Sequence, residues 1–313
     1  MRQPEDNDTN SPTEGGLTFD FLHETPRTAK LVDLLIETRR SQGFVHQRNL
    51  FTPEPEDSKL RKLLFALSAL LPRDGLYNRF KMVVDGKERD FSVPCDVLEL
   101  FCSEYLIPLI KSQKPHPSCH GAEPGWTPRR SLETHLPVSC ALSLDMKSAF
   151  PSVPYHNVYN FYYQLSGDRD IAGFLAAIST VQYEKKRGLP QGANFSPSLF
   201  NRLLRGMDEA IFQAAKHRRM GYSRWVDDVA ITSPDCRGIE CFLGAVELVS
   251  RYMPVSPTKT YYQGEGDIFL LGHIIVGGSV VRKNSKEERE MKKSSPIDVD
   301  SLVRGGRRYE LWI

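Results

Sequence analysis

The feature that most constrains this chain of 313 residues is the placement of acidic residues at the ends of apolar segments. Asp145 directly follows the apolar segment 141–144, and Asp227 and Asp228 lie together between two further apolar segments. A carboxylate beside a core is costly to bury unless it is paired. A divalent cation offsets that cost, and Mg²⁺ in phosphoryl-transfer sites is typically held by one or two carboxylates plus substrate phosphates. The alternative is an acidic turn that is capped by backbone amides or paired with Arg224.

The order of expected helices and strands indicates the α+β class. Hydrophobic spacing predicts helices over 28–40, 58–71, 96–112 and 239–251, with a loop rich in Pro, Gly, His and Ser over 113–138. Further expectations are a hairpin around Asp85-Gly86, a strand from Cys140, a helix with Ser196 as N-cap, a strand-turn-strand over 222–231 and a strand over 267–276. Because strands and helices interleave without a regular βαβ rhythm, we expect an α+β fold.

Composition excludes several classes of protein. Hydrophobic residues make up 40% and charged residues 26%, which is typical of globular chains. No apolar run approaches the roughly 18 residues of a membrane span, and the polar N-terminus does not resemble a secretory signal. Six cysteines without a C-x-x-C pair favour reduced thiols in a cytoplasmic protein. A zinc site at His116, Cys119 and His120 is not expected, because a second ligand pair is missing.

The two ends of the chain differ in charge. Residues 1–16 hold one Arg and four acidic residues, for a net charge of −3, and should be disordered. Residues 282–308 hold nine Lys or Arg and five acidic residues, for a net charge of +4. The basic segment suits a phosphate-binding surface, whereas charge alone favours a solvated helix face.

Five segments in fixed order resemble the palm motifs of reverse transcriptases. They are Asp145 to Phe150, Arg187 to Gly192 with Ser196-Pro197, Arg224 to Asp228, Pro257 to Lys259 and Leu270 to His273. Trp225 departs from the Tyr or Phe that is usual in the third motif. Upstream, Gly86 to Arg89 with Pro94 resembles the fingers hairpin, and His120 to Ser131 resembles the loop before the first palm motif in bacterial enzymes. The resemblance spans about residues 78–275 and is nearest to compact retron-type, intron-type and defence-associated enzymes.

The resemblance implies a right-hand polymerase of fingers, palm and short thumb. The expected division is a disordered acidic tail over 1–26, fingers with N-terminal helices over 27–140, a catalytic palm over 141–275 and a short or truncated thumb over 276–313. Its palm would be an antiparallel sheet packed on helices.

The resemblance also implies a two-metal site. Asp145 and Asp227 would bind two Mg²⁺ ions, or Mn²⁺ in their place, with help from Asp228 and the backbone carbonyl of Met146. Lys259 would donate a proton to the departing pyrophosphate. Without the family, Lys259 is equally well explained as a surface lysine.

Other residues would bind the incoming nucleotide. Phe150, next to Ala149, would lie under the sugar and collide with a 2′-hydroxyl, so deoxynucleotides would be admitted. Gln191 and Gly192 would line the nucleotide and template pocket. The alternatives are a simple core Phe and an ordinary turn before a helix. Viral RNA-copying RNA polymerases typically carry Asp in place of Phe150 and Gly in place of Val226, so this chain favours a DNA product.

The fingers hairpin would supply cations for the triphosphate. Arg89 would hold it bidentately, and Lys87 and Lys81 could share this role. A two-residue turn places Met82 opposite Arg89 and Lys81 opposite Asp90. An exposed Lys81–Asp90 pair is the alternative role for Lys81.

Leu271, Gly272 and His273 would form the primer grip, although a single histidine is more often structural. The implied partners are an RNA template, a DNA or RNA primer, and a structured non-coding RNA or partner protein, with no membrane. Two alternatives stay open. One is a template-independent or protein-primed DNA polymerase, and the other is a nucleic-acid-binding subunit that is active only within a larger ribonucleoprotein. Family analogy alone suggests a retron, intron or antiviral defence role.

The basic C-terminal segment generates a first prediction. We expect Arg304, Arg307 and Arg308 to contact the template–primer backbone, because this family places its thumb after the primer grip. Neutralising all three together should weaken primer–template binding and make its salt dependence shallower, with little effect on the chemical step. Affinity measured across a salt series checks this, and an unchanged slope with intact binding would contradict it.

Overall fold

The computed structural model describes residues 25–42, 55–71, 75–84, 86–184, 186–235, 239–264 and 266–283. The acidic tail, most of the basic C-terminal segment and the candidate residues Arg304, Arg307 and Arg308 lie outside this part of the chain. No helix within the described ranges is long and apolar enough to cross a membrane.

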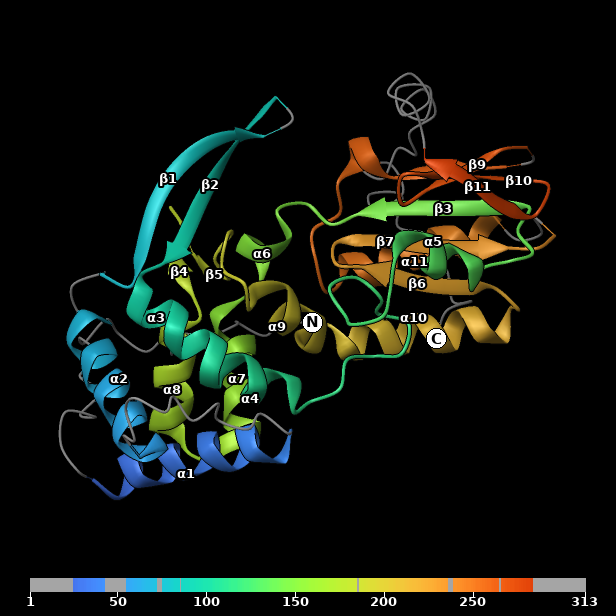
Figure 1. The fold of residues 1–313 in the computed structure, drawn as a ribbon. Coiled ribbons are helices and arrows are strands. Elements are labelled where there is room, and N and C mark those ends of the chain that lie inside the picture. The colour runs from blue at the N-terminus through green and yellow to red at the C-terminus, as the bar shows by residue number, and fades with distance from the viewer. Residues whose placement is uncertain are drawn as a thin grey trace, which may run out of the picture.

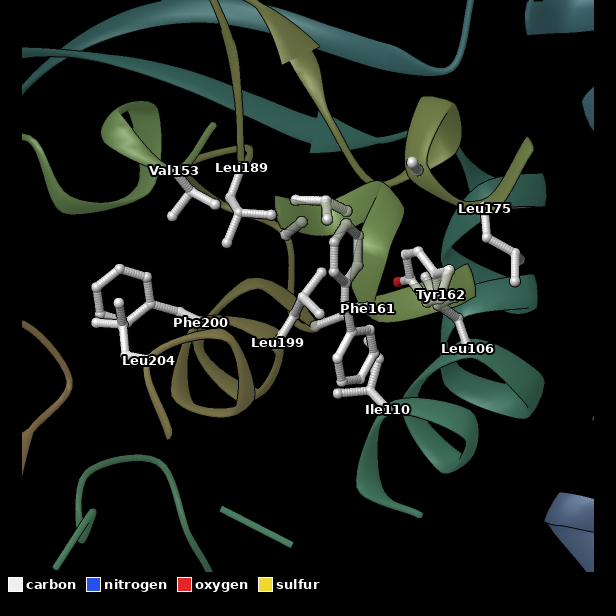
Figure 2. Close-up of a cluster of buried hydrophobic side chains, with 14 of the residues drawn as sticks. Leu106, Ile110, Val153, Phe161, Tyr162, Leu175, Leu189, Leu199, Phe200 and Leu204 are labelled. Carbon is white, nitrogen blue, oxygen red and sulfur yellow. The ribbon is translucent and has the colours of Figure 1, made fainter. Parts of the chain in front are cut away.

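A helical lobe forms one side of the molecule (Figure 1). It contains α1 (Pro26–Ser41), α2 (Glu56–Leu70), α3 (Asp96–Phe101), the π-helical segment η2 (Cys102–Leu106), α4 (Ile107–Lys111), α7 (Tyr155–Ser166) and α8 (Arg169–Ile178). The first five elements confirm the helices predicted over 28–40, 58–71 and 96–112. Figure 2 shows side chains of η2, α4, α7 and the neighbouring α9 (Ser196–Leu203) pointing into one apolar cluster.

A long hairpin projects from the helical lobe (Figure 1). It is formed by β1 (Tyr77–Val84) and β2 (Lys87–Pro94), which are antiparallel with Val84 opposite Lys87 and Met82 opposite Arg89. This register confirms the predicted two-residue turn. Gly86 has φ of +72°, a conformation that glycine adopts without steric cost. Only the base of the hairpin is buried, so its tip can meet a ligand.

The other side of the molecule is built on a four-stranded antiparallel sheet in the order β6-β7-β3-β8. Its strands are β3 (Cys140–Asp145), β6 (Gly221–Trp225), β7 (Asp228–Ser233) and β8 (Tyr261–Gln263). These strands confirm the buried strand from Cys140 and the strand-turn-strand around the acidic pair.

The two faces of this sheet have different coverings. Leu142 and Leu144 of β3 belong to the main core, with residues of α9, α10 (Arg205–His217) and α11 (Ile239–Ser250). Ala141 and Ala230 face the opposite way, in a smaller core with a second sheet. Since side chains alternate along a strand, Asp145 lies on the face of Ala141 and away from the helices.

The second sheet corrects one expectation. Instead of a single strand over 267–276, the chain forms β9 (Ile268–Leu270) and β10 (His273–Val276), followed by β11 (Ser279–Lys283). The turn between β9 and β10 has positive φ at both Leu271 (+46°) and Gly272 (+72°). Turns of this kind favour Asn-Gly or Gly-Gly. A leucine at the first position hid the turn within an apolar run.

Two further expectations were wrong in detail. Ser196 is the first helical residue of α9 rather than its N-cap, and its hydroxyl donates to the carbonyl of Pro190 at 2.8 Å. The predicted loop 113–138 contains the short helix α5 (Pro128–Glu133), which Thr127 caps through its side chain. The remaining short elements are α6 (Ala149–Ser152), β4 (Val181–Gln182), β5 (Arg187–Gly188) and η3 (Pro257–Lys259).

The cysteines also differ from expectation. Cys95, Cys102 and Cys119 are free, but Cys140 is disulfide-bonded. The expectation of reduced thiols was therefore wrong for Cys140.

A buried polar network fixes the loop before β3 to the sheet. His135 Nε2 lies 2.7 Å from the Ser223 hydroxyl of β6, and its Nδ1 lies 2.8 Å from the Thr232 hydroxyl of β7. Ser131 joins the same Ser223 hydroxyl to the ring of His120. Burial lowers the pKa of His135 to about 4. The His135 ring is therefore neutral at neutral pH, and each of its ring nitrogens has a hydroxyl partner.

Acid should weaken the fold through His135. The folded-state pKa is depressed, so the contribution of the neutral ring is fully present above pH 6.5 and is lost as pH falls toward 4. We expect the free energy of unfolding to fall by up to about 1.4 kcal/mol per pH unit in that window from this residue. Urea unfolding across pH measures it. His135→Gln should flatten the slope, and His156→Gln on the exposed surface of α7 should not. Equal slopes in the two variants would contradict the assignment.

Candidate nucleotidyl-transfer site

A cavity of about 1040 Å³ lies between the β1–β2 hairpin and the end of β3. It brings together most of the candidate residues taken from the sequence. Those among its lining are Lys87, Arg89, Asp145, Met146, Ala149, Phe150, Gln191, Asp227 and Lys259. Residues that are far apart in the chain thus surround one space.

The main chain fixes the two acidic residues side by side. Asp145 is the last residue of β3 and is buried, and Asp227 lies in the turn between β6 and β7. The amide of Met146 donates to the carbonyl of Asp227 at 3.0 Å, and the amide of Ser256 donates to the carbonyl of Asp145 at 2.8 Å. The backbone therefore sets the separation of the carboxylates before any ligand binds.

The charges in this site compensate one another. Lys259 Nζ lies 2.5 Å from Asp145 Oδ1. Burial, and next the negative charge of Asp145, raise the pKa of Asp227. Burial opposes protonation of Lys259, but its hydrogen bond to Asp145 and the negative charges of Asp145, Asp228 and Asp227 together outweigh burial and raise the pKa of Lys259. A nearby positive charge therefore stabilises the ionised form of these two neighbouring carboxylates.

The donor set fits a hard divalent cation that completes its shell with substrate. Within the described ranges, no group of three or more His, Cys, Asp and Glu side chains converges to hold a metal ion. Asp145 and Asp227 give two carboxylates, and Mg²⁺ commonly takes only one or two from the protein. Asp228 is the cross-strand partner of Asp145 but is not among the cavity lining.

Phe150 serves the cavity and the core together. It lies on α6, directly after Ala149. The preceding residue, Ser148, has φ of +50° and turns the chain into this helix. The half-buried ring packs edge-on against Phe200 with centroids 5.4 Å apart, and it also lines the cavity. Its carbonyl accepts the amide of Leu189 at 2.9 Å. The ring is therefore held rigidly at the wall of the cavity.

The segment Gln191-Gly192 holds the base of the hairpin. The amide of Ser92 donates to the carbonyl of Gln191 at 2.7 Å. Gly192 has φ of +108°, and a Cβ there would lie 3.2 Å from the ring of Phe91. Gly192 itself is not among the cavity lining. Glycine is needed at this position for the close approach of the two segments.

The hairpin cations divide into two groups. Lys87 and Arg89 line the cavity, whereas Lys81 does not. Lys81 is indeed opposite Asp90 in register, but its ammonium pairs with the diagonal Glu88 at 2.8 Å. Both side chains of that pair are exposed, so the pair adds little stability.

Two other candidate groups lie outside this cavity. Leu271, Gly272 and His273 form the β9–β10 turn, where His273 Nδ1 lies 3.0 Å from the carbonyl of Leu271. His116 accepts the amide of Ser118 and lies near Glu209. His120 is hydrogen-bonded to Ser131 and stacks on Trp126.

The cavity also contains residues that the sequence did not single out. Tyr183, Glu184 and Lys186 reach it from the β4–β5 connection, and Lys147 lines it as well. Their signal was only a charged stretch before the second motif, which is also typical of a surface turn.

The antiparallel sheet on helices, with paired carboxylates at a strand end beneath a hairpin, defines a right-hand polymerase fold. The family model described as "Reverse transcriptase (RNA-dependent DNA polymerase)" matches residues 101–275. The chain belongs to the reverse transcriptase family.

Curated relatives agree with this family. The chain is 27% identical over 150 residues to "Retron Mx65 reverse transcriptase" of Myxococcus xanthus, covering 43% of this chain and 35% of that protein. It is 29% identical over 105 residues to "Retron Ec86 reverse transcriptase" of Escherichia coli, covering 34% and 32%. The chain thus spans about a third of the length of these relatives.

Solved structures of similar fold include an apo telomerase from Candida Tropicalis, truncated from its C-terminal domain. The identity is 14% and the TM-score 0.48, covering 67% of this chain and 55% of that one. Another is the BmCPV RNA-dependent RNA polymerase at elongation state, with 10% identity and a TM-score of 0.46, covering 83% and 29%.

Proposed function

We propose that this chain is an RNA-directed DNA polymerase that adds deoxynucleotides to a primer 3′-hydroxyl. The observation that supports this most is the meeting of Asp145, Asp227, Phe150 and Arg89 around one cavity. Membership of the reverse transcriptase family supports RNA as the template. In this proposal residues 27–140 are fingers, 141–275 palm and 276–313 thumb, although α7 and α8 of the palm segment lie with the helical lobe (Figure 1).

Asp145 and Asp227 would hold two Mg²⁺ ions, with Mn²⁺ as a substitute. The carbonyl of Met146 would serve as a further ligand, and Asp228 would add negative charge from the end of β7. When bound, the ions stabilise the attacking and leaving oxygens of an in-line displacement. The nearness of the two carboxylates, with Lys259 paired to Asp145, supports this proposal.

Lys259 would act as general acid toward the departing pyrophosphate. Its ammonium already lies within the cavity, and the nearby carboxylates keep it protonated. Arg89 and Lys87 would hold the triphosphate from the hairpin side, with Lys81 outside this set. Gln191 would contact the nucleotide, and Leu271, Gly272 and His273 would support the primer.

Phe150 would exclude ribonucleotides by meeting a 2′-hydroxyl, next to Ala149 on the same wall. The remaining proposals are a primer of DNA or RNA, a structured non-coding RNA or protein partner, and a cytoplasmic location. The retron names of the relatives support the RNA partner, and a defence role is its natural extension.

The decisive test is to give the purified protein primed RNA, deoxynucleotides and Mg²⁺. Extension of the primer along the template supports the proposal. Synthesis without a template or primer would replace it with a template-independent or protein-primed polymerase. Activity only after a partner RNA or protein is added would indicate a component of a larger assembly.

Asp227→Asn should reduce synthesis by about 10³-fold, which corresponds to about 4 kcal/mol of lost transition-state stabilisation. The fold should persist, because the change removes a charge that is already unfavourable beside Asp145. Single-turnover primer extension, with thermal unfolding alongside, measures both effects. Asp267→Asn, at an exposed position outside the cavity, is the matched control. Near-native synthesis by folded Asp227→Asn would refute the metal-ligand role.

Phe150→Ala should admit ribonucleotides more readily relative to deoxynucleotides, by about tenfold or more. The reason is that removal of the ring opens the cavity wall where a 2′-hydroxyl would lie. Phe150→Tyr keeps the bulk and should keep the discrimination. Single-turnover rates with matched ribo- and deoxynucleotides give the ratio. An unchanged ratio in Phe150→Ala would make Phe150 only a packing partner of Phe200.

A further inference from the structure

Arg224 is the largest fully buried side chain in the described part of the chain. It lies on β6, facing α10, where Asp208 is likewise inaccessible to solvent. Its Nε donates to Asp208 Oδ1 and its Nη2 to Oδ2, both at 2.7 Å. This is the planar, two-point pairing that a guanidinium forms and an ammonium cannot.

The remaining donors of Arg224 reach the catalytic turn and α9. Nη1 donates to the carbonyl of Val226 at 2.7 Å and to Asn201 Oδ1 at 3.1 Å, and Nη2 also approaches the carbonyl of Asn201 at 3.4 Å. All five N–H groups of the guanidinium therefore have acceptors. The Val226 carbonyl belongs to the residue directly before Asp227.

Val226 has φ of +57°, which is unfavourable for a β-branched residue. Such a conformation persists only where the surroundings over-determine it. Arg224 holds the carbonyl of Val226. Gly121 also lies against this turn, where a Cβ would come within 2.5 Å of the Val226 amide nitrogen. The turn that carries Asp227 is thus clamped by a guanidinium and a glycine.

The chain flanking the clamp is also fixed. The carbonyl of Arg224 accepts the amides of His120 and Gly121, and its own amide donates to the carbonyl of Ser118. Further along the same turn, the carbonyl of Asp227 accepts the amide of Met146, the residue after Asp145. A shift of the Arg224 guanidinium would therefore be passed to Asp227 through the single peptide unit that joins Val226 to Asp227.

We propose that Arg224, oriented by Asp208, is a positioning residue that fixes the Val226 turn and thereby sets the Asp227 carboxylate relative to Asp145. The proposal rests on the function proposed above. Buried ion pairs are weak contributors to stability, because desolvation offsets most of their attraction. This pair instead specifies geometry, at a place where misplacement of about 1 Å can cost roughly 10²-fold in rate.

Two variants separate positioning from stability. In Arg224→Lys the charge remains, but the fork that joins Asp208 to Val226 is lost. A triple variant, Arg224→Met with Asp208→Leu and Tyr222→Phe, removes the ion pair together with the hydroxyl that donates to Asp208. Apolar replacement of a whole buried pair is often neutral or stabilising, so this protein should fold. The matched control is Arg39→Lys, a buried arginine of α1 paired with Glu56 and Glu104 far from the turn.

The readouts are kcat, the KM for deoxynucleotide, the Mg²⁺ concentration for half-maximal rate, and unfolding by urea. Both Arg224 variants should lose about 10²-fold in kcat, require more Mg²⁺ and keep the KM for deoxynucleotide within about twofold. Mn²⁺, which binds such ligands more tightly, should restore part of the rate. Arg39→Lys should lose stability without these changes. The proposal is overturned if the Arg224 variants match Arg39→Lys in kcat and Mg²⁺ requirement.

Mn²⁺ binding followed by electron paramagnetic resonance, with primer–template present, tests the inference independently of synthesis. Weaker Mn²⁺ binding by Arg224→Lys than by the unaltered protein supports the positioning role, whether or not synthesis occurs. If such a difference is found but neither protein synthesises DNA, only the proposed function fails. Equal binding in the two proteins, or no binding by either, overturns the inference.

Discussion

The closeness of two carboxylates, Asp145 at the end of β3 and Asp227 in the next turn, is the constraint on which the site depends. Burial, and next the negative charge of Asp145, raise the pKa of Asp227, which expresses the cost of holding both carboxylates ionised there. Lys259 supplies one positive charge against Asp145 at 2.5 Å. The remaining negative charge of the two carboxylates attracts cations. The closeness of Asp145 and Asp227 therefore weakens the fold locally and also favours metal binding.

The alternation of side chains across β3 explains how one short strand supports both core and chemistry. Leu142 and Leu144 anchor the strand to the helices, while Ala141 leaves room for a second sheet on the opposite face. Asp145 continues the Ala141 face beyond the edge of that covering sheet. A shift of register by one residue would turn Asp145 into the helical core, so packing of the leucines fixes the catalytic face as firmly as any polar contact.

Sequence reasoning recovered what local patterns and motif order encode. The register of the hairpin and the strand before Asp145 were predictable, because periodicity and turn chemistry act over a few residues. The meeting of distant motifs around one cavity was predictable only from the resemblance to reverse transcriptases. It failed where tertiary contacts override local preference. Leu271 adopts a positive φ within an apolar run. Lys81 forms its ion pair with the diagonal Glu88 rather than with the opposite Asp90.

The buried clamp was beyond sequence reasoning for a related reason. The sequence suggests only the neighbouring Asp227 and Asp228 as partners for Arg224, because it shows which residues are adjacent in the chain and not which are adjacent in the fold. In the folded chain it turns to Asp208 on α10 instead. The acidic pair is consequently left without that arginine.

The clamp changes the meaning of one sequence difference. From the sequence alone, Val226 and Phe150 together favour a DNA product, because viral RNA-copying RNA polymerases typically carry glycine in place of Val226. The structure shows that the position requires φ of +57°, a conformation that glycine adopts freely and valine only under constraint. Val226 is not among the residues that line the cavity, whereas Phe150 is. The proposed selection of deoxynucleotides therefore depends on Phe150.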